Sequence, residues 1–317
     1  MPWRRGARFL IVLIIVVGGW WLLQNTPDRL APSPAGVENL HVVTTTPILY
    51  SLAAKVLGDR GTLTNLVPSG ASPENYALRP QDAKILERAD VLVRVGLDFE
   101  RFLERPLADA AQRGVTVITA SDGIQTLSAE AHGDAEEEEG AHEEEEGASD
   151  PHVWTDPLRA ITMVENIANG LAQADPAGAD EYRARAATVA DELRALDAEF
   201  RRKLATGRST KFIAFHPAWG YFAERYGLEQ AAVVEKVPGV EPTAQELAEL
   251  TRTIRASGIR ALMSEPQLSA KVIEAIARDL RLNVVEVNPE GGDLAIDGYE
   301  KLMRANVDAF ARALSAK

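Results

Sequence analysis

A chain of 317 residues is long enough for two ordinary domains, and 46% apolar residues suffice for buried cores, which excludes a disordered or fibrous protein. The absence of cysteine excludes disulfides, thiolate metal sites and cysteine nucleophiles, so any metal must bind His, Asp, Glu or Asn. Eleven acids and no Lys or Arg lie in residues 128–150; outside them the net charge is only −2, and no nucleic-acid partner is expected.

The N-terminus has the order of an export signal. Arg4, Arg5 and Arg8 precede the uncharged, largely apolar run 9–24, and a Pro-rich spacer follows. The run is longer than most signal-peptide cores and slightly shorter than a comfortable membrane span, so its length leaves cleavage open. We favour an uncleaved membrane anchor and treat residues 1–37 as signal or anchor plus spacer. Either outcome places the rest of the chain outside the cytoplasm.

The next part of the chain, residues 38–179, predicts a first α/β lobe. Short β-branched runs predict strands, and stretches with helical spacing lie between them. Such alternation favours a mostly parallel sheet. The predicted strands are 41–46, 63–68, 91–95 and 115–119, and the predicted helices include 51–57 and 80–89.

Within this lobe, the acidic segment 128–150 cannot bury apolar area and is expected to be a mobile loop. It contains His132 and His142 and runs directly into Asp150-Pro151-His152. A solvated spacer and a weak collector of metal ions are both compatible with this composition, and the two interpretations stay open.

Residues 180–205 predict one amphipathic helix, because apolar side chains recur there at offsets of three and four. At 1.5 Å per residue it would be about 39 Å long, enough to join two lobes rigidly. Residues 206–317 predict a second lobe of the same kind. Its predicted strands are 212–215, 231–234, 261–264 and 284–287, and its predicted helices are 219–226, 244–256 and 270–280.

Three polar motifs stand near predicted strand ends, where ligands bind in open α/β sheets. They are Gly70–Tyr76 (GASPENY), Asp150–Trp154 (DPHVW) and Phe215–Phe222 (FHPAWGYF). Two histidines, His152 and His216, thus come from different lobes, each beside proline and aromatic residues. Imidazole with carboxylate suits Zn²⁺ or Mn²⁺.

From about His41 to Lys317 the sequence resembles the zinc/manganese substrate-binding proteins of ABC transporters, the high-affinity zinc-uptake type of periplasmic metal receptor. The matching pieces are VVTTTPILYSLAAKVLGD, LVPSGASPENYALRPQDAKILERADVLVRVGLDFE, the acidic loop, DPHVWTDP, FIAFHPAWGYFAERYGL, VPGVEPTAQELAEL and ALMSEPQLS. The resemblance implies two α/β lobes bridged by one long helix, with the metal in the cleft between the lobes.

The same resemblance implies a ligand set that departs from the usual one. Glu74 takes the place of the family's first histidine, and His152 and His216 match the second and third. Asn288 stands where an aspartate is usual, so Glu290, Asp293 or water is an alternative fourth ligand. Histidine at the third position points to Zn²⁺, with Mn²⁺ or Fe²⁺ as weaker alternatives.

The function implied is capture of Zn²⁺ outside the cytoplasm and delivery to an ABC permease in the inner membrane, by a monomer without enzymatic activity. An alternative is a diverged surface protein that buffers metal or serves cell adhesion without a transporter. A zinc hydrolase is disfavoured, because the sequence has no HExxH motif and no nucleophile elbow.

Overall fold

The computed structural model describes residues 39–68, 70–129, 148–266, 270–291 and 298–315. The expected signal or anchor segment, His132, His142 and Asp293 lie outside these residues. Among the described residues, no helix is both long and apolar enough to cross a membrane.

The first lobe is built on a four-stranded parallel sheet with the order β2-β1-β3-β4. Its strands are β1 (Leu40–Thr44), β2 (Gly61–Asn65), β3 (Val91–Arg94) and β4 (Thr116–Thr119). Its helices are α2 (Pro47–Leu57), α3 (Pro80–Glu87) and α4 (Glu104–Gln112), with 3₁₀ turns η1 (Gly58–Arg60), η2 (Pro73–Asn75) and η3 (Arg101–Leu103). The predicted strands are confirmed with shifted ends, whereas α4 was not predicted.

The second lobe repeats this plan with the order β6-β5-β7-β8, again all parallel. Its strands are β5 (Lys211–Ala214), β6 (Glu229–Val233), β7 (Ala261–Ser264) and β8 (Asn283–Glu286). Its helices are α7 (Gly220–Tyr226), α8 (Ala244–Ser257), α9 (Ala270–Leu280) and α10 (Tyr299–Ser315). The C-terminal helix α10 was not predicted.

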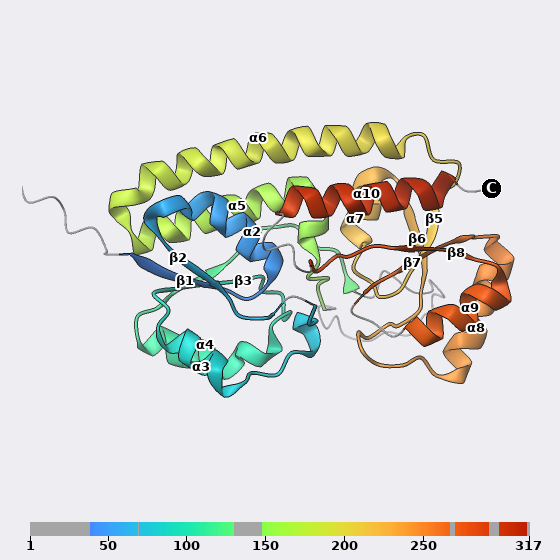
Figure 1. The fold of residues 1–317 in the computed structure, drawn as a ribbon, viewed down its shortest axis with the longest axis horizontal. Helices are drawn as coiled ribbons and strands as arrows, with labels where there is room; N and C mark the ends of the chain where they lie inside the picture. Colours follow the sequence, from blue (N-terminus) through green and yellow to red (C-terminus); the bar gives the residue numbers. More distant parts are fainter. Residues whose placement is uncertain (1–38, 69, 130–147, 267–269, 292–297, 316–317) are drawn as a thin grey trace, which may run out of the picture. The chain divides into compact units, whose positions relative to one another are not determined.

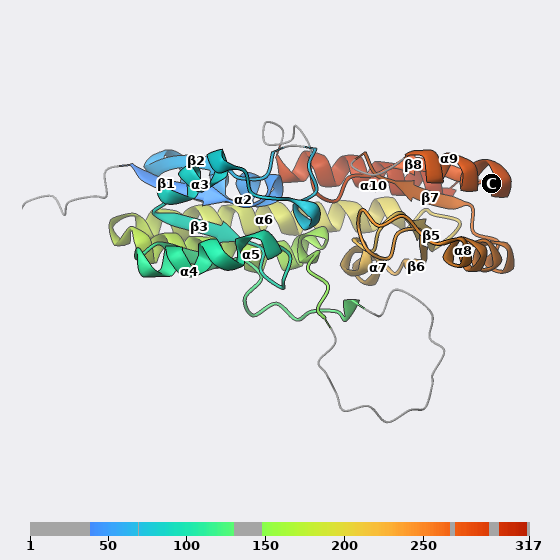
Figure 2. The ribbon, with the colours of Figure 1, turned by 90° about the horizontal axis from the view of Figure 1, so that it is seen from below.

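Two antiparallel helices, α5 (Pro157–Ala174) and α6 (Ala179–Leu204), lead from the first lobe to the second, with 3₁₀ turn η6 (Pro176–Gly178) between them. The 26 residues of α6 confirm the predicted linking helix within one residue at each end. It begins with acidic and ends with basic residues, which suits the helix dipole. Figures 1 and 2 show α6 running past both sheets.

The two lobes share one hydrophobic core, which holds them together more firmly than α6 alone could. This core contains Val42 of β1, Leu193 of α6, Phe212 of β5 and Phe310 of α10. Helix α10 packs against α6 and also contacts α2 of the first lobe. We therefore expect little change in the orientation of the lobes when a ligand enters or leaves the cleft between them.

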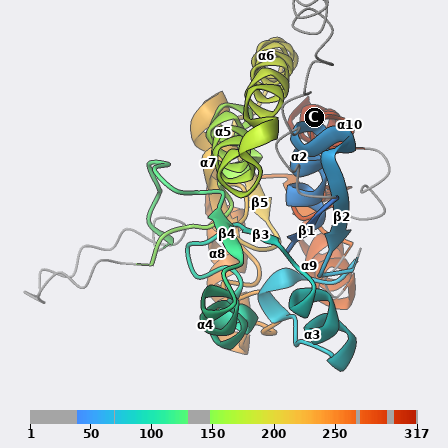
Figure 3. The same cartoon turned by 90° about the vertical axis from the view of Figure 1, so that its left-hand side faces the viewer.

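Each sheet is covered on both faces, because successive side chains of a strand point in opposite directions. Val42 packs into the shared core, whereas its neighbour Val43 packs with Leu86 of α3 and with Leu103 of η3, the turn before α4. Figure 3 shows this order of layers in the first lobe, with α2 and α5 on one side of the sheet and α3 and α4 on the other. The prediction of two α/β lobes with parallel sheets is confirmed, and in each lobe both faces of the sheet are covered.

Candidate metal centre

Three short segments carry the side chains that meet between the lobes. Glu74 lies in η2, which follows β2 and begins at Pro73. His152 precedes the 3₁₀ turn η5 (Val153–Thr155), after which Asp156 caps the start of α5. His216 follows β5 by two residues. Glu74 and His152 therefore come from the first lobe, and His216 comes from the second.

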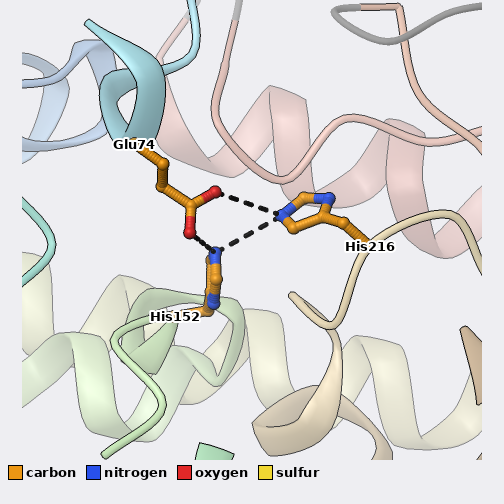
Figure 4. A group of neighbouring side chains, drawn as sticks. All are labelled: Glu74, His152 and His216. Carbon is orange, nitrogen blue, oxygen red and sulfur yellow. Dashed lines mark hydrogen bonds and ion pairs between the residues drawn. The ribbon is translucent and has the colours of Figure 1, made fainter. Parts of the chain in front are cut away.

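These three side chains form a compact cluster, and among the described residues they are the group whose potential ligand atoms all lie within 4.8 Å of one another. The Nε2 atoms of His152 and His216 are 3.4 Å apart. The carboxylate oxygens of Glu74 lie 4.0 Å from Nε2 of His152 and 3.9 Å from Nε2 of His216. Figure 4 shows both rings directing Nε2 toward the carboxylate.

A second carboxylate lies behind each imidazole. Nδ1 of His152 is 2.8 Å from Oδ1 of Asp150, which also accepts a hydrogen bond from the backbone N–H of His152. Nδ1 of His216 is 2.6 Å from Oε2 of Glu265, in an ion-pair contact whose direction departs from that of an ideal hydrogen bond. All four side chains are buried. This arrangement orients each ring so that Nε2 faces the cluster.

The surrounding carboxylates change the pKa values of the histidines. Burial by itself lowers the pKa of His216, but Glu265, Glu74 and Glu290 outweigh burial and raise it to about 10. Burial also lowers the pKa of His152, and the hydrogen bond with Asp150 reverses the direction, so that the net pKa is raised. The site is thus electrostatically prepared for positive charge.

Glu290 lies near this cluster without belonging to it. Its Oε1 accepts a hydrogen bond from Oγ of Ser72 at 3.0 Å, whereas its buried Oε2 has no hydrogen-bond partner. Burial, followed by the carboxylates of Glu74 and Glu265, raises the pKa of Glu290 to about 7 against the opposing effect of the two histidines. Oε2 is therefore a buried acceptor that a cation could satisfy.

Asn288 follows β8 by two residues and lies in the turn that leads to Glu290. Its Oδ1 accepts hydrogen bonds from the backbone N–H groups of Glu290 at 3.2 Å and Gly291 at 2.9 Å. This amide oxygen therefore caps the turn that carries Glu290. The side chain of Asn288 thus stabilises the turn on which Glu290 lies.

A cavity of about 990 Å³ opens beside the cluster. Its walls come from both lobes, with Glu74, Phe99 and His152 on one side and Pro217 and Val237 on the other. His216 lies deeper and is only 1% exposed. The cluster thus sits at the inner end of an interlobe cleft, and a small ion can reach it from the cavity.

The donor set fits a small, tetrahedral divalent ion. Two metal–nitrogen bonds of about 2.05 Å at a tetrahedral angle place the nitrogens about 3.3 Å apart, whereas neighbouring ligands of an octahedral ion with bonds of about 2.1 Å are about 3.0 Å apart. The two nitrogens are 3.4 Å apart, which is a hydrogen-bond contact in the metal-free chain and is compatible with the tetrahedral case. Glu74 has to approach each nitrogen by about 0.6 Å to complete it. Oε2 of Glu74 is buried and has no hydrogen-bond partner, which also favours a cation.

The sequence did not assign a role to Glu265 or Glu235. Both follow strands of the second sheet directly or after one residue, as His216 does after β5. Each strand of the second lobe is followed within two residues by a polar residue, and this pattern in the sequence could have pointed to Glu265 and Glu235 as residues near the site. What it could not show is that β7 lies beside β5, which brings Glu265 to His216.

Known proteins resemble this chain over most of its length. The family model described as "Zinc-uptake complex component A periplasmic" matches residues 42–313. The high-affinity zinc uptake system protein ZnuA of Bacillus subtilis (strain 168) is 31% identical over 289 residues, which cover 88% of this chain and 89% of that protein. A crystal structure of ZnuA superposes with a TM-score of 0.76 and 32% identity, covering 87% of this chain and all of that one.

A longer relative is the zinc-binding protein AdcA of Streptococcus pyogenes serotype M3, which is 28% identical over 278 residues. The match covers 85% of this chain but only 53% of AdcA, so the chain spans about half the length of this relative. The family model, in contrast, matches residues 42–313, most of the chain. The chain therefore belongs to the family of periplasmic zinc-uptake component A, the substrate-binding proteins of zinc uptake.

Proposed function

We propose that this chain binds one Zn²⁺ in the interlobe cleft through Glu74, His152 and His216, with Glu290 as the fourth ligand. The observation that carries the proposal is that the two Nε2 atoms lie 3.4 Å apart and face a carboxylate oxygen of Glu74 that has no hydrogen-bond partner. Asn288 would act by positioning Glu290, since its amide oxygen already accepts two backbone hydrogen bonds. Ser72 would hold Glu290 until the ion arrives.

Zinc is the ion that this donor set favours over Mn²⁺ and Fe²⁺. Imidazole nitrogen suits zinc, whereas manganese favours carboxylate, carbonyl and water oxygens, usually in an octahedral arrangement. Two imidazole donors in the cluster therefore support zinc. Zinc uptake by the relative from B. subtilis supports the same cargo.

The ion is cargo, and the protein is proposed to deliver it to an ABC permease rather than to use it in catalysis. The family and the apolar run near the N-terminus support a location outside the cytoplasm, with residues 9–24 as a membrane anchor. Capture there would concentrate a scarce ion at the membrane. The cavity gives the ion a short path to and from the cluster.

A calorimetric titration of residues 38–317 with Zn²⁺ and with Mn²⁺ tests the binding proposal. One tight equivalent of zinc, bound more strongly than manganese, supports it. Binding of zinc no tighter than that of a solvent-exposed carboxylate cluster would refute it. Delivery is tested separately in cells that lack the gene, which should need more zinc to grow in chelator-treated medium.

Glu265→Gln is expected to weaken zinc binding by about 10–100-fold, the usual effect of losing a carboxylate behind a ligating histidine. The substitution keeps the shape of the side chain but removes the charge that faces Nδ1 of His216. Glu286→Gln, an exposed position at the end of β8, is the matched control. Competition with a chelator measures both, and equal affinities in the two variants would contradict the role of Glu265.

Removing residues 130–147 is expected to leave the cleft affinity unchanged while abolishing additional weak equivalents. The two ends of the segment are already joined, because Ser128 pairs with Ser149 and the N–H of Ala129 donates to the carbonyl of Ala148 at 2.7 Å. An Asn-Gly turn can therefore connect Ala129 to Ala148 as in a hairpin. Calorimetry that shows loss of the tight phase would place a true ligand in the deleted segment.

A further inference from the structure

The turn that carries Glu74 touches the opposite lobe at a second point. Nδ2 of Asn75 donates a hydrogen bond to the carbonyl of Pro238 at 3.0 Å. The next residue, Gly239, packs against the same amide group, since a Cβ placed on it would lie 2.5 Å from Nδ2 of Asn75. Its φ of +76° also favours glycine. Glycine at this position therefore permits the contact.

The second-lobe side of this contact is held by a buried carboxylate. Glu235 follows β6, is 2% exposed, and accepts a hydrogen bond from the N–H of Gly239 at 3.1 Å. The N–H of Val240 donates to the carbonyl of Val237 and closes the turn. Burying a carboxylate costs free energy unless its oxygens accept hydrogen bonds, as an oxygen of Glu235 does from Gly239. The turn 237–240 is thus fixed from within its own lobe.

The same residues connect the two ligand-bearing segments. The N–H of Glu235 donates at 2.8 Å to the carbonyl of Phe215, the residue before His216. At the other end, Asn75 directly follows Glu74. A continuous series of hydrogen bonds therefore runs from the His216 segment through Glu235 and the turn 237–240 to the Glu74 segment. Asn75 and Pro238 both line the cavity beside the cluster.

We propose that Asn75 and Gly239 form a latch between the lobes that sets how long the ion is retained, a proposal that rests on the proposed function. Glu74 lies in a three-residue turn on the cleft wall, and the latch holds this turn toward the two histidines. When the latch opens, Glu74 is free to leave the ion and the remaining ligands release it. Asn75 and Gly239 are positioning residues, and they act mainly on the dissociation rate.

Stopped-flow transfer of Zn²⁺ from the loaded full chain to excess chelator measures that rate. Asn75→Ala is expected to speed dissociation about 3–10-fold, in line with the net value of one hydrogen bond. The association rate should change less than about twofold, because most effects of this kind fall on dissociation. An unchanged dissociation rate in Asn75→Ala would overturn the latch.

Gly239→Ala disrupts the same contact from the side of the second lobe, because the added Cβ displaces the amide of Asn75. Gly258→Ala is the matched control, since Gly258 has a φ of +66° and nothing within 4 Å of an added Cβ. Both changes strain the backbone, but only Gly239→Ala should speed release, by a factor similar to Asn75→Ala. The double variant Asn75→Ala/Gly239→Ala should release zinc no more than about twice as fast as Gly239→Ala, because both changes break one contact.

The outcomes separate the latch from the proposed function. A wild-type chain that holds no zinc would refute the proposed function itself. A wild-type chain that holds zinc, with an unchanged dissociation rate in Asn75→Ala or in Gly239→Ala, would overturn only the latch. Faster release from Gly258→Ala to the same extent would also overturn it, because the effect would then follow backbone strain.

Discussion

Replacing His216 or His152 with alanine is expected to weaken zinc binding by about 100-fold or more. Each change removes a proposed ligand, and loss of a residue that only hydrogen-bonds a ligand already lowers metal affinity by about 10–100-fold. Both rings are almost fully buried, and their Nε2 atoms face the same point. Chelator competition followed by a zinc-sensitive dye measures the dissociation constants.

His41→Ala is the matched control for these variants, because His41 is an exposed histidine whose Nδ1 bonds Oγ1 of Thr62 on the first sheet. Its zinc affinity should equal that of the wild type. Since a cavity in the core could also unfold the chain, the melting temperature of each metal-free variant is measured alongside. A folded His216→Ala chain with wild-type affinity would exclude His216 as a ligand.

The affinity for zinc is expected to rise steeply with pH. In the metal-free chain the pKa of His216 is raised to about 10, so its ring carries a proton throughout the neutral range, and zinc must displace that proton. Displacement of one proton per ion makes the affinity rise about tenfold per pH unit, up to the pKa. Protonation of His216 also stabilises the metal-free fold, because the pKa of this ring is about 10 in the folded chain and about 6.5 in the unfolded chain. This contribution to stability is complete below about pH 6.5 and is lost as the pH rises through about 10.

Glu290 should make this dependence steeper at low pH. Its pKa is raised to about 7, so below that value zinc must displace a second proton if Glu290 becomes the fourth ligand. Glu290→Gln should remove the part of this steepness that Glu290 contributes, and the parts contributed by His216 and by His152, whose pKa is also raised, should remain. Titrations between pH 6 and 8.5 in metal-buffered solution measure both slopes. An affinity that is flat over this range would contradict displacement of protons from the cluster.

Much of the fold follows from local patterns in the sequence, as α6 illustrates. Its apolar side chains at offsets of three and four, among them Tyr182, Leu193 and Phe200, are all buried. The ends of strands do not follow from such patterns, because a run of apolar residues indicates burial and not pairing with a neighbouring strand. The predicted strand 63–68 is β2 at Gly61–Asn65, and Leu66 and Val67 are buried in the loop beyond it.

The residues of the site could be predicted from local motifs, but the contacts of some of them could not. Glu74, His152 and His216 stand in recognisable motifs, and the structure brings all three together. Asn288 occupies the position after β8 at which a ligand was expected. Asparagine readily bonds nearby backbone N–H groups, and here it does so, which only the turn geometry reveals.

Anomalous diffraction at the zinc edge from crystals of the zinc-loaded chain tests the central claim most directly. The account predicts one strong peak in the cleft, about 2.0–2.1 Å from Nε2 of His152 and of His216 and about 2.0–2.2 Å from a carboxylate oxygen of Glu74. A chain that carries its zinc at another place, with no peak between these three side chains, would contradict it.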